Sequence, residues 1–243
     1  MNVALTAGGR ISGAYAEAAG TTIKALAPVG DATMLAKAIA AARGTGAERI
    51  AVVGGEEVER ACRRDVDRVV GESEDGRENL LRGLTAWPED EPLLLMTTDL
   101  PFVTASALRA FLDLAPDAAF AMPLATPAAF DERFPGAPAY GIALAGERVV
   151  NGGAFRFPAG CAGRIAGVAA AFFAARKSPF AMAALLGPAL AIRFLTNRLS
   201  IAALEADAAR RFGVAARAVR GCAPELCFDA DAVEEYRYAL ARA

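Results

Sequence analysis

Between Pro92 and Thr97 the chain reads Leu-Leu-Leu-Met, with no polar side chain in the run. A strand with one face in water alternates apolar and polar residues, whereas a strand covered on both faces is continuously apolar. Other short apolar runs alternate with stretches of helical periodicity along the chain. The sequence therefore predicts an α/β fold with a mostly parallel, Rossmann-like sheet and helices on both of its faces.

The same patterns give approximate positions for the elements. We expect strands at residues 2–6, 49–53, 68–70, 92–97, 118–122, 146–149, 153–157 and 217–220. We expect helices at residues 31–43, 56–63, 77–86, 104–114, 165–176, 179–186, 201–212 and 232–242. Asp31 and Thr104 can cap the helices that follow them, and Gly44 can end the first helix. Residues 126–139, rich in proline and alanine, predict an excursion over the sheet edge or the ligand site. No repeat or low-complexity linker divides the chain, so a single domain, residues 1–243, is predicted.

The chain contains no histidine among its 243 residues, and this excludes several kinds of catalysis. Ser-His-Asp and Cys-His mechanisms and the usual histidine-containing zinc sites all require that residue. Acid–base or metal chemistry must then use carboxylates, Lys, Arg, Tyr, Cys or backbone amides. The formal net charge is −2. Because nucleic-acid-binding proteins normally carry a basic surface, we expect no nucleic-acid partner.

Segments for targeting or membrane insertion are not visible in the sequence. The first residues form neither a basic region nor a long apolar stretch, so no signal peptide is expected. The uncharged stretch at residues 179–192 is shorter than the roughly 20 residues that a membrane span needs. We therefore expect a soluble, cytoplasmic protein without a membrane partner. The four scattered cysteines predict buried or half-buried reduced thiols. The apolar helices expected at residues 165–195 can form either a covering layer or a homodimer surface.

Two segments near the start could bind phosphate. Gly8-Gly9-Arg10 directly follows the first expected strand. Glycines in this position let backbone N–H groups approach a phosphate, and the arginine can neutralise it, although such a pair can also form an ordinary tight turn. Lys24 lies one loop downstream among apolar residues. It can serve as a point charge for a triphosphate or be a surface lysine at a strand edge.

Three aspartates are candidate metal ligands. Asp99 stands at the end of the apolar strand at 92–97, where open α/β sheets bind ligands. A carboxylate in this position commonly holds a divalent cation that bridges phosphates, and the alternative is a turn cap. Asp229 and Asp231 are spaced by two and project to the same side if the segment is extended. They can complete a site with Asp99 or cap the last helix.

Two further polar segments stand at an expected turn and at an expected helix start. Asn151-Gly152-Gly153 contains the Asn-Gly pair that is typical of a hairpin turn. Asn79 lies at the start of a helix that follows the loop at residues 71–76. That helix start can face a nucleotide or be a solvated helix end.

Taken together, five short motifs resemble those of the MobA-like nucleotidyltransferase superfamily. They are Leu5-Thr6-Ala7-Gly8-Gly9, residues 24–30 with Met34-Leu35, Thr98-Asp99-Leu100-Pro101-Phe102, Asn151-Gly152-Gly153, and Phe228-Asp229-Ala230-Asp231 with Glu234-Glu235. None of these motifs is highly specific alone. Their order along essentially the whole chain is specific to the superfamily. The superfamily includes proteins similar to the guanylyltransferase of molybdenum cofactor synthesis and to sugar-phosphate nucleotidyltransferases. The resemblance implies a single-domain Rossmann-like fold of the GT-A type.

The resemblance also implies an activity. It implies transfer of a nucleoside monophosphate (NMP) from a nucleoside triphosphate (NTP) to a small phosphorylated acceptor, with Mg²⁺ as cofactor and pyrophosphate as product. Residues 1–123 would bind the nucleotide and residues 124–243 the acceptor. The implied nucleotide contacts are Leu5, Ala7, Gly8, Gly9, Lys24 and Asp99, to which we add Asn79. Lys24 and Asp99 would be catalytic, Asp99 with Asp229 or Asp231 would hold Mg²⁺, and Asn151, Gly152 and Gly153 would contact the acceptor.

The first loop departs from the pattern of the family. The family sequence usually reads G-G-x-G-x-R, whereas here Gly8-Gly9 is followed by Arg10-Ile11-Ser12-Gly13. Arg10 is therefore the candidate to replace the usual arginine in catalysis. Two alternatives stay open: a glycosyltransferase of the GT-A architecture that uses a nucleotide-sugar, and a nucleotide-binding paralogue that has lost catalysis.

Overall fold

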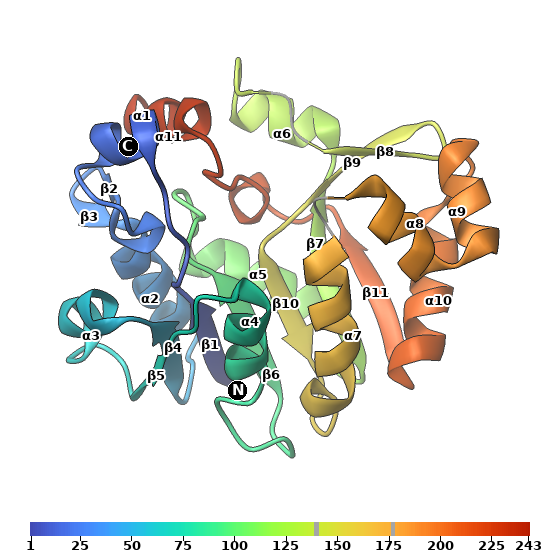
Figure 1. Cartoon of the computed structure of the whole chain (residues 1–243), viewed down its shortest axis with the longest axis horizontal. Helices are drawn as coiled ribbons and strands as arrows, with labels where there is room; N and C mark the ends of the chain where they lie inside the picture. The colour runs from blue at the N-terminus through green and yellow to red at the C-terminus, as the bar shows by residue number, and fades with distance from the viewer. Residues whose placement is uncertain (139–140, 176–177) are drawn as a thin grey trace.

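The computed structural model describes residues 1–138, 141–175 and 178–243, and one nine-stranded sheet runs through the molecule (Figure 1). The sheet order is β5-β4-β1-β6-β10-β7-β9-β8, with β11 also paired to β7. The strands are β1 (Asn2–Thr6), β4 (Ile50–Gly54), β5 (Arg68–Gly71), β6 (Leu93–Thr97), β7 (Ala119–Ala125), β8 (Ile142–Leu144), β9 (Glu147–Asn151), β10 (Ala154–Phe157) and β11 (Ala215–Arg220). A separate small hairpin is formed by β2 (Pro28–Val29) and β3 (Ala32–Thr33).

Helices cover both faces of the sheet. The helices in the described residues are α1 (Gly13–Ala19), α2 (Met34–Gly44), α3 (Glu56–Cys62), α4 (Gly76–Leu84), α5 (Ala105–Leu114), α6 (Pro127–Arg133), α7 (Ala162–Ala175), α8 (Pro179–Leu186), α9 (Pro188–Leu195), α10 (Ile201–Phe212) and α11 (Val233–Leu240). The pairings β5/β4, β4/β1, β1/β6 and β7/β11 are parallel, whereas β10, β9 and β8 join by antiparallel pairings. The predicted fold class is confirmed.

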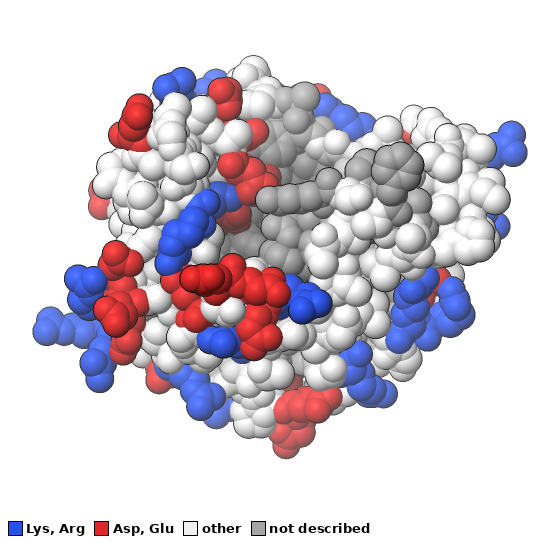
Figure 2. Space-filling view, in the orientation of Figure 1, with Lys and Arg blue, Asp and Glu red and all other residues white. Residues whose placement is uncertain are grey.

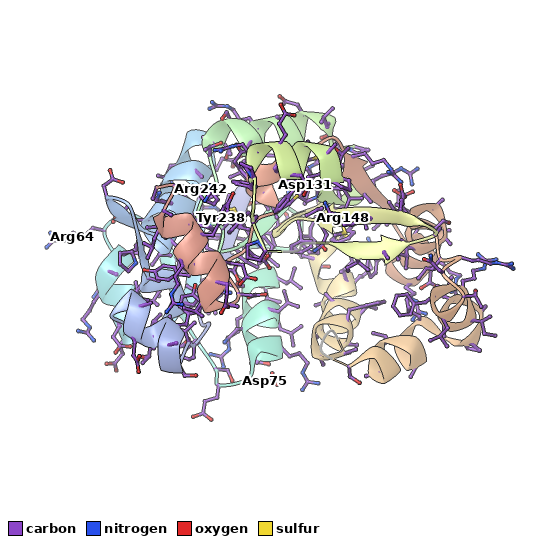
Figure 3. The ribbon with its side chains drawn as sticks, turned by 90° about the horizontal axis from the view of Figure 1, so that it is seen from above. Arg64, Asp75, Asp131, Arg148, Tyr238 and Arg242 are labelled. Atoms are coloured by element: carbon purple, nitrogen blue, oxygen red, sulfur yellow. The ribbon has the colours of Figure 1, made fainter. Side chains whose placement is uncertain are left out.

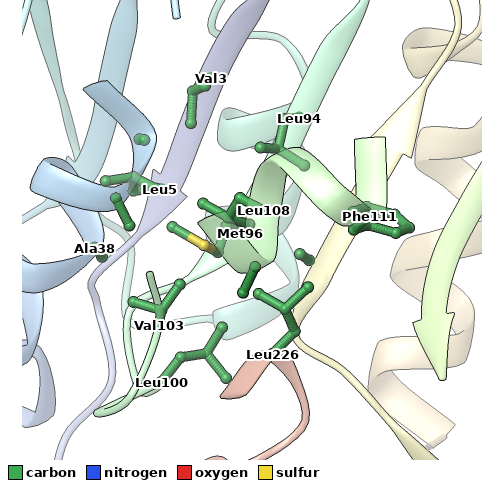
Figure 4. Packing of buried hydrophobic residues seen from close by; sticks show 14 of the residues in the cluster. Val3, Leu5, Ala38, Leu94, Met96, Leu100, Val103, Leu108, Phe111 and Leu226 are labelled. Atoms are coloured by element: carbon green, nitrogen blue, oxygen red, sulfur yellow. The ribbon is translucent and has the colours of Figure 1, made fainter. Parts of the chain in front are cut away.

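The continuous apolar strand proves to be buried on both sides. Leu94 and Met96 of β6 pack with Leu5 of β1 and with α2 and α5 on one face (Figure 4). Leu93 and Leu95 point to the other face and pack with α4 and α7. Figure 1 shows these two helical layers, with α4 and α7 in front of the sheet and α2 and α5 behind it. Burial on both faces explains why β6 lacks the polar alternation of a half-exposed strand.

Several expected element boundaries were wrong, each for a local reason. The predicted cap Asp31 lies in the turn of the β2–β3 hairpin, and the N-cap of α2 is Thr33, whose side chain accepts from the Ala36 amide. Residues 13–19, for which no helix was expected, form α1. The excursion at residues 126–139 contains α6, and its last residue lies outside the described residues. The Thr104 cap is confirmed by its hydrogen bond from the Ala107 amide.

The second half also differs in detail. β9 and β10 flank Asn151-Gly152-Gly153 but do not pair with each other, because β10 lies between β6 and β7. The hairpin interpretation of this segment is therefore wrong. The stretch after Gly187-Pro188 forms a further helix, α9, that the sequence patterns missed. The predicted helix at 165–176 is α7, and Arg176 lies outside the described residues.

Two expectations about the molecule as a whole can be compared with the structure. All four cysteines, Cys62, Cys161, Cys222 and Cys227, are buried and free, which confirms the prediction of buried reduced thiols. Among the described residues, none of the helices has the length and apolar character that crossing a membrane requires.

Candidate active site

Two parallel strands, β1 and β6, end side by side and lead into the loops that carry most of the predicted site residues. Residues 7–10 follow β1, and Thr98 and Asp99 follow β6. The Thr98 hydroxyl donates a 2.9 Å hydrogen bond to the Thr6 carbonyl and holds the two strand ends together. Seen from above, α1, α6 and α11 lie around this edge of the sheet (Figure 3). Open α/β sheets bind ligands at such carboxyl ends.

The Lys24 ammonium group lies between two carboxylates. Lys24 begins a short 3₁₀ turn, and its side chain is largely buried. Its Nζ donates a 2.7 Å hydrogen bond to Asp99 Oδ2 and a second one to Asp231 Oδ1. Three residues that are far apart in the sequence, and that the sequence singled out separately, therefore meet at one point.

These contacts change how the groups ionise. Burial alone would lower the pKa of Lys24, but the charges of Asp99 and Asp231 raise it above its ordinary value. Burial alone would raise the pKa of Asp99, but the Lys24 ammonium holds that pKa below its usual range. The lysine is therefore charged and Asp99 ionised at neutral pH.

Asp229 lies near enough to Asp99 and Asp231 for their charges to affect its ionisation. Burial, followed by the charges of Asp99 and Asp231, raises the pKa of Asp229 to about 7. The segment is fixed to the Asp99 loop, because the Ala230 amide donates a 2.9 Å hydrogen bond to the Asp99 carbonyl. The alternative role as helix caps is wrong for Asp229 and Asp231, since the N-cap of α11 is Ala232.

The aspartate carboxylates offer oxygen donors of the kind that a magnesium ion binds. Asp99 Oδ1 is buried and lacks a hydrogen-bond partner within the described residues, so one hard oxygen donor remains available beside the cluster. In the described parts of the chain, no three acidic or cysteine side chains converge as a complete ligand set. Mg²⁺ is usually bound by one or two carboxylates together with substrate phosphates, and Asp99 with Asp231 or Asp229 fits that arrangement.

The glycine loop offers fewer free amides than the sequence predicts. The Ala7 amide donates to the Val53 carbonyl at 2.8 Å and is therefore used within the sheet. The amides of Gly8 and Gly9 donate no hydrogen bond to any described residue. The Lys24 amide donates to the Gly9 carbonyl at 3.0 Å, which joins this loop to the lysine. The Leu5 side chain is fully buried in the core.

Comparison with known families gives a match over most of the chain. Residues 5–191 match the model of the MobA-like NTP transferase domain. The chain belongs to this family. The match includes Lys24 and Asp99 and ends before Asp229 and Asp231, so the family match does not cover the last two carboxylates. A search of curated proteins found no match to the chain.

Solved structures support the fold of this MobA-like domain. A hypothetical transferase structure from Thermus thermophilus has a TM-score of 0.82 and 29% sequence identity, over 96% of this chain and 98% of that chain. A nucleotidyl transferase from Methanothermobacter thermautotrophicus has a TM-score of 0.57 and 18% identity, over 99% and 96% of the two chains. A protein from Mycobacterium tuberculosis H37Rv in complex with manganese has a TM-score of 0.52 and 19% identity, over 99% and 97%.

Arg10 is held by a residue that the sequence patterns missed. Its guanidinium group pairs with the Glu72 carboxylate and donates a 3.3 Å hydrogen bond to the Gly8 carbonyl. Glu72 follows β5, and its oxygens also approach Gly8 and Gly55. A Cβ added at Gly8 would lie 2.7 Å from Glu72 Oε2, so the Glu72 carboxylate would have to move to admit a side chain there. The position of Glu72 after a parallel strand was the available signal.

Asn79 lies next to the same loop in this MobA-like domain. Its side chain accepts from the Ser73 amide at 2.6 Å and donates to the Ser73 carbonyl at 2.8 Å. Asn79 Nδ2 would be 2.8 Å from a Cβ at Gly8. Asn79 therefore fixes the loop before α4 against the first glycine. Figure 2 shows acidic side chains gathered over α3 and the start of α4.

The predicted acceptor segment crosses close to other backbone. Gly152 and Gly153 donate 2.9 Å hydrogen bonds to the carbonyls of Pro123 and Leu226. A Cβ at Gly152 would lie 2.5 Å from the Leu226 carbonyl oxygen, and a Cβ at Gly153 would lie 2.5 Å from Thr97 Oγ1. Both glycines are thus required for packing beside the end of β6, whereas Asn151 is exposed.

Three interactions hold α6 and the residues that follow it in place. Arg148 of β9 pairs with Asp131 of α6 at 2.7 Å, and the two side chains point toward each other in Figure 3. Tyr238 and Arg242, at the end of the chain, both donate to the Pro135 carbonyl, at 3.1 and 2.9 Å. These bonds connect α6 to the sheet and to α11.

Proposed function

We propose that the protein transfers NMP from an NTP to a small phosphorylated acceptor and releases pyrophosphate, with Mg²⁺ as cofactor. Membership of the MobA-like NTP transferase family supports nucleotidyl transfer as the general class of reaction. The observation that carries the finer proposal is the meeting of Lys24 with Asp99 and Asp231 beside the glycine loop.

The charges suggest how the triphosphate lies. The Gly8 and Gly9 amides donate to no acceptor among the described residues, and two cations, Arg10 and Lys24, lie next to this loop. The acidic first turn of α3 makes the other flank unfavourable for phosphate, whereas the Glu72 carboxylate is paired with the Arg10 guanidinium. We therefore assign the phosphates to the side of Lys24, and the base and ribose to the side of Asn79.

In the proposed reaction an oxygen of the acceptor phosphate attacks the α-phosphorus in line. The bond from that phosphorus to the bridging β-oxygen breaks, and pyrophosphate leaves with the electron pair. Lys24 binds phosphate oxygens and offsets the charge that develops on them. Asp99, with Asp231 or Asp229, would hold Mg²⁺, which would offset the negative charge of the phosphates. No histidine and no side-chain nucleophile is needed.

The acceptor is assigned to residues 124–243, beside Asn151, Gly152 and Gly153. The boundary at residue 123 lies within β7, so the two halves share one sheet. The segment at 151–153 is tied to the end of β6 through the 2.9 Å bond from the Thr97 amide to the Gly153 carbonyl. An acceptor on this side would therefore approach Asp99 from across β6. A cytoplasmic location and a homodimer through the helices at residues 165–195 stay predictions.

The proposal is tested with the purified protein, each of the four common NTPs, Mg²⁺ and a panel of sugar phosphates, with pyrophosphate as the readout. We expect one NTP and one class of acceptor to release pyrophosphate together. Binding of NTP without pyrophosphate from any acceptor would favour a paralogue without catalysis. Preferential binding of nucleotide-sugars would favour the glycosyltransferase alternative.

The metal assignment makes a separate prediction. Asp99→Asn removes one anionic oxygen donor, so we expect Mg²⁺–NTP affinity to fall by about 10-fold or more and pyrophosphate release to be lost. Asp117→Asn, at an exposed position on the opposite edge, is the control. Calorimetric titration of Mg²⁺–NTP measures the affinity. Unchanged affinity in a folded Asp99→Asn protein would show that Asp99 is not a ligand.

A further inference from the structure

The segment that carries Asp229 and Asp231 is neither helix nor strand and lies between a 3₁₀ turn and α11. Its middle residue, Ala230, is fully buried. The Ala230 amide donates to the Asp99 carbonyl at 2.9 Å. The Ala230 carbonyl accepts a 2.8 Å hydrogen bond from the Tyr15 hydroxyl. Both backbone groups of the residue between the two carboxylates are therefore fixed by other parts of the chain.

Tyr15 belongs to α1, which follows directly on the loop where this chain departs from the family pattern. The ring is 6% exposed and stacks on Tyr236 of α11, with ring centroids 4.9 Å apart. Tyr236 in turn donates a 2.8 Å hydrogen bond to the Pro28 carbonyl, just after the Lys24 turn. A small apolar cluster thus joins α1, the Lys24 segment and α11 directly beneath the carboxylates.

We propose that Tyr15 is a positioning residue that, through the Ala230 carbonyl, holds Asp229 and Asp231 at the distance from Asp99 that a shared divalent cation requires. This inference rests on the proposed function. Hydrogen bonds made to metal ligands orient those ligands, and mutation of the bonding partner typically lowers metal affinity by about 10–100-fold. Tyr15 does not touch the reacting groups. Its effect passes through the backbone between the two aspartates.

The two stacked tyrosines offer matched variants. Tyr15→Phe keeps the stacked ring and removes the hydroxyl that binds Ala230. Tyr236→Phe also keeps the ring and removes a buried hydroxyl, but its partner is Pro28. Each variant loses one hydrogen bond, so we expect both melting temperatures to fall by similar amounts, about 2–4 °C. Stability alone therefore does not distinguish them.

The measurement is Mn²⁺ binding in the presence of a non-hydrolysable NTP analogue, followed by electron paramagnetic resonance of the free ion. We expect Tyr15→Phe to weaken Mn²⁺ binding by about 10-fold and Tyr236→Phe to leave it within about 2-fold of the wild type. Hydrogen exchange gives a second readout without metal. The Ala230 amide should exchange faster in Tyr15→Phe than in Tyr236→Phe.

The outcomes separate the two proposals. If the wild-type protein binds no Mn²⁺–nucleotide, the proposed function fails. If the wild type binds and both variants bind equally well, with equal exchange at Ala230, then Tyr15 supports only the fold and the inference is overturned.

Discussion

The Lys24 ammonium group offsets the negative charge of the Asp99 carboxylate, and both side chains are largely buried. The pKa of Asp99 is held below its ordinary value, so this pair stabilises the fold above the ordinary pKa of an aspartate. That contribution is lost as the pH falls through the lowered pKa of Asp99. The native structure therefore gains from the lysine at neutral pH and not in strong acid.

Lys24→Met tests this contribution. We expect the free energy of unfolding at pH 7 to fall by about 2 kcal/mol, because a largely buried carboxylate loses its partner. The deficit should shrink as the pH is lowered below about 4, where Asp99 is protonated in the unfolded chain. Lys37→Met on α2 is the matched control. Urea unfolding at several pH values measures the loss of unfolding free energy in each variant. A loss in Lys24→Met that does not change with pH would contradict the pairing of Lys24 with Asp99.

Single residues of the site were predictable where the strand pattern located them. Asp99 follows a strand that is unmistakably central, and Lys24 and Asp231 were recognised through motifs in family order. Glu72 was missed because β5 is short and half-exposed, so its carboxyl end gave a weak signal. Tyr15 was missed because α1 has seven residues and no capping side chain, and alanine-rich sequence gave it no clear periodicity.

At the scale of elements, the connection from β9 to β10 depends on close backbone approach. The Asn-Gly pair predicted a hairpin from local turn preference, but β10 instead inserts between β6 and β7. Strand order depends on contacts with distant segments, which local sequence does not specify. The glycines are required here because Leu226 and Thr97 leave no room for a side chain.

Gly152→Ala tests this packing. Its Cβ would lie 2.5 Å from a backbone carbonyl oxygen, so the chain must shift, and we expect a loss of about 2 kcal/mol in unfolding free energy. Gly167→Ala in α7 is the matched control, because beyond its own helix backbone and chain neighbours no described atom lies within 4 Å of the added methyl group. There we expect a gain of about 0.5–1 kcal/mol. Equal effects in chemical denaturation would contradict the close approach.

At the scale of the whole molecule, one sheet joins the two halves of the chain. β10, from the second half, is paired on one side with β6 and on the other with β7. The last strand of the first half to be paired, β6, therefore takes its hydrogen-bonding partner on one side, β10, from the second half of the chain. The alternation of buried strands and helices along the sequence correctly predicted a sheet with helices on both faces. It could not predict that β10 inserts between β6 and β7, antiparallel to both.

This arrangement predicts cooperative unfolding. Trp87 is the single tryptophan, and its indole donates a 2.8 Å hydrogen bond to Val3 in the first half. We expect its fluorescence and the far-ultraviolet circular dichroism of the whole chain to follow the same transition in urea. A separate, earlier loss of helical signal with unchanged tryptophan emission would show that the second half unfolds independently.

The central claim is that a nucleotidyl group, and not a phosphoryl group, is transferred. The direct measurement uses the NTP and acceptor that release pyrophosphate, with the NTP labelled at the α-phosphate in one reaction and at the γ-phosphate in another. We predict that the α-label appears in the acceptor product and the γ-label in pyrophosphate, and that Asp99→Asn produces neither. Transfer of the γ-label to the acceptor would contradict the proposed function.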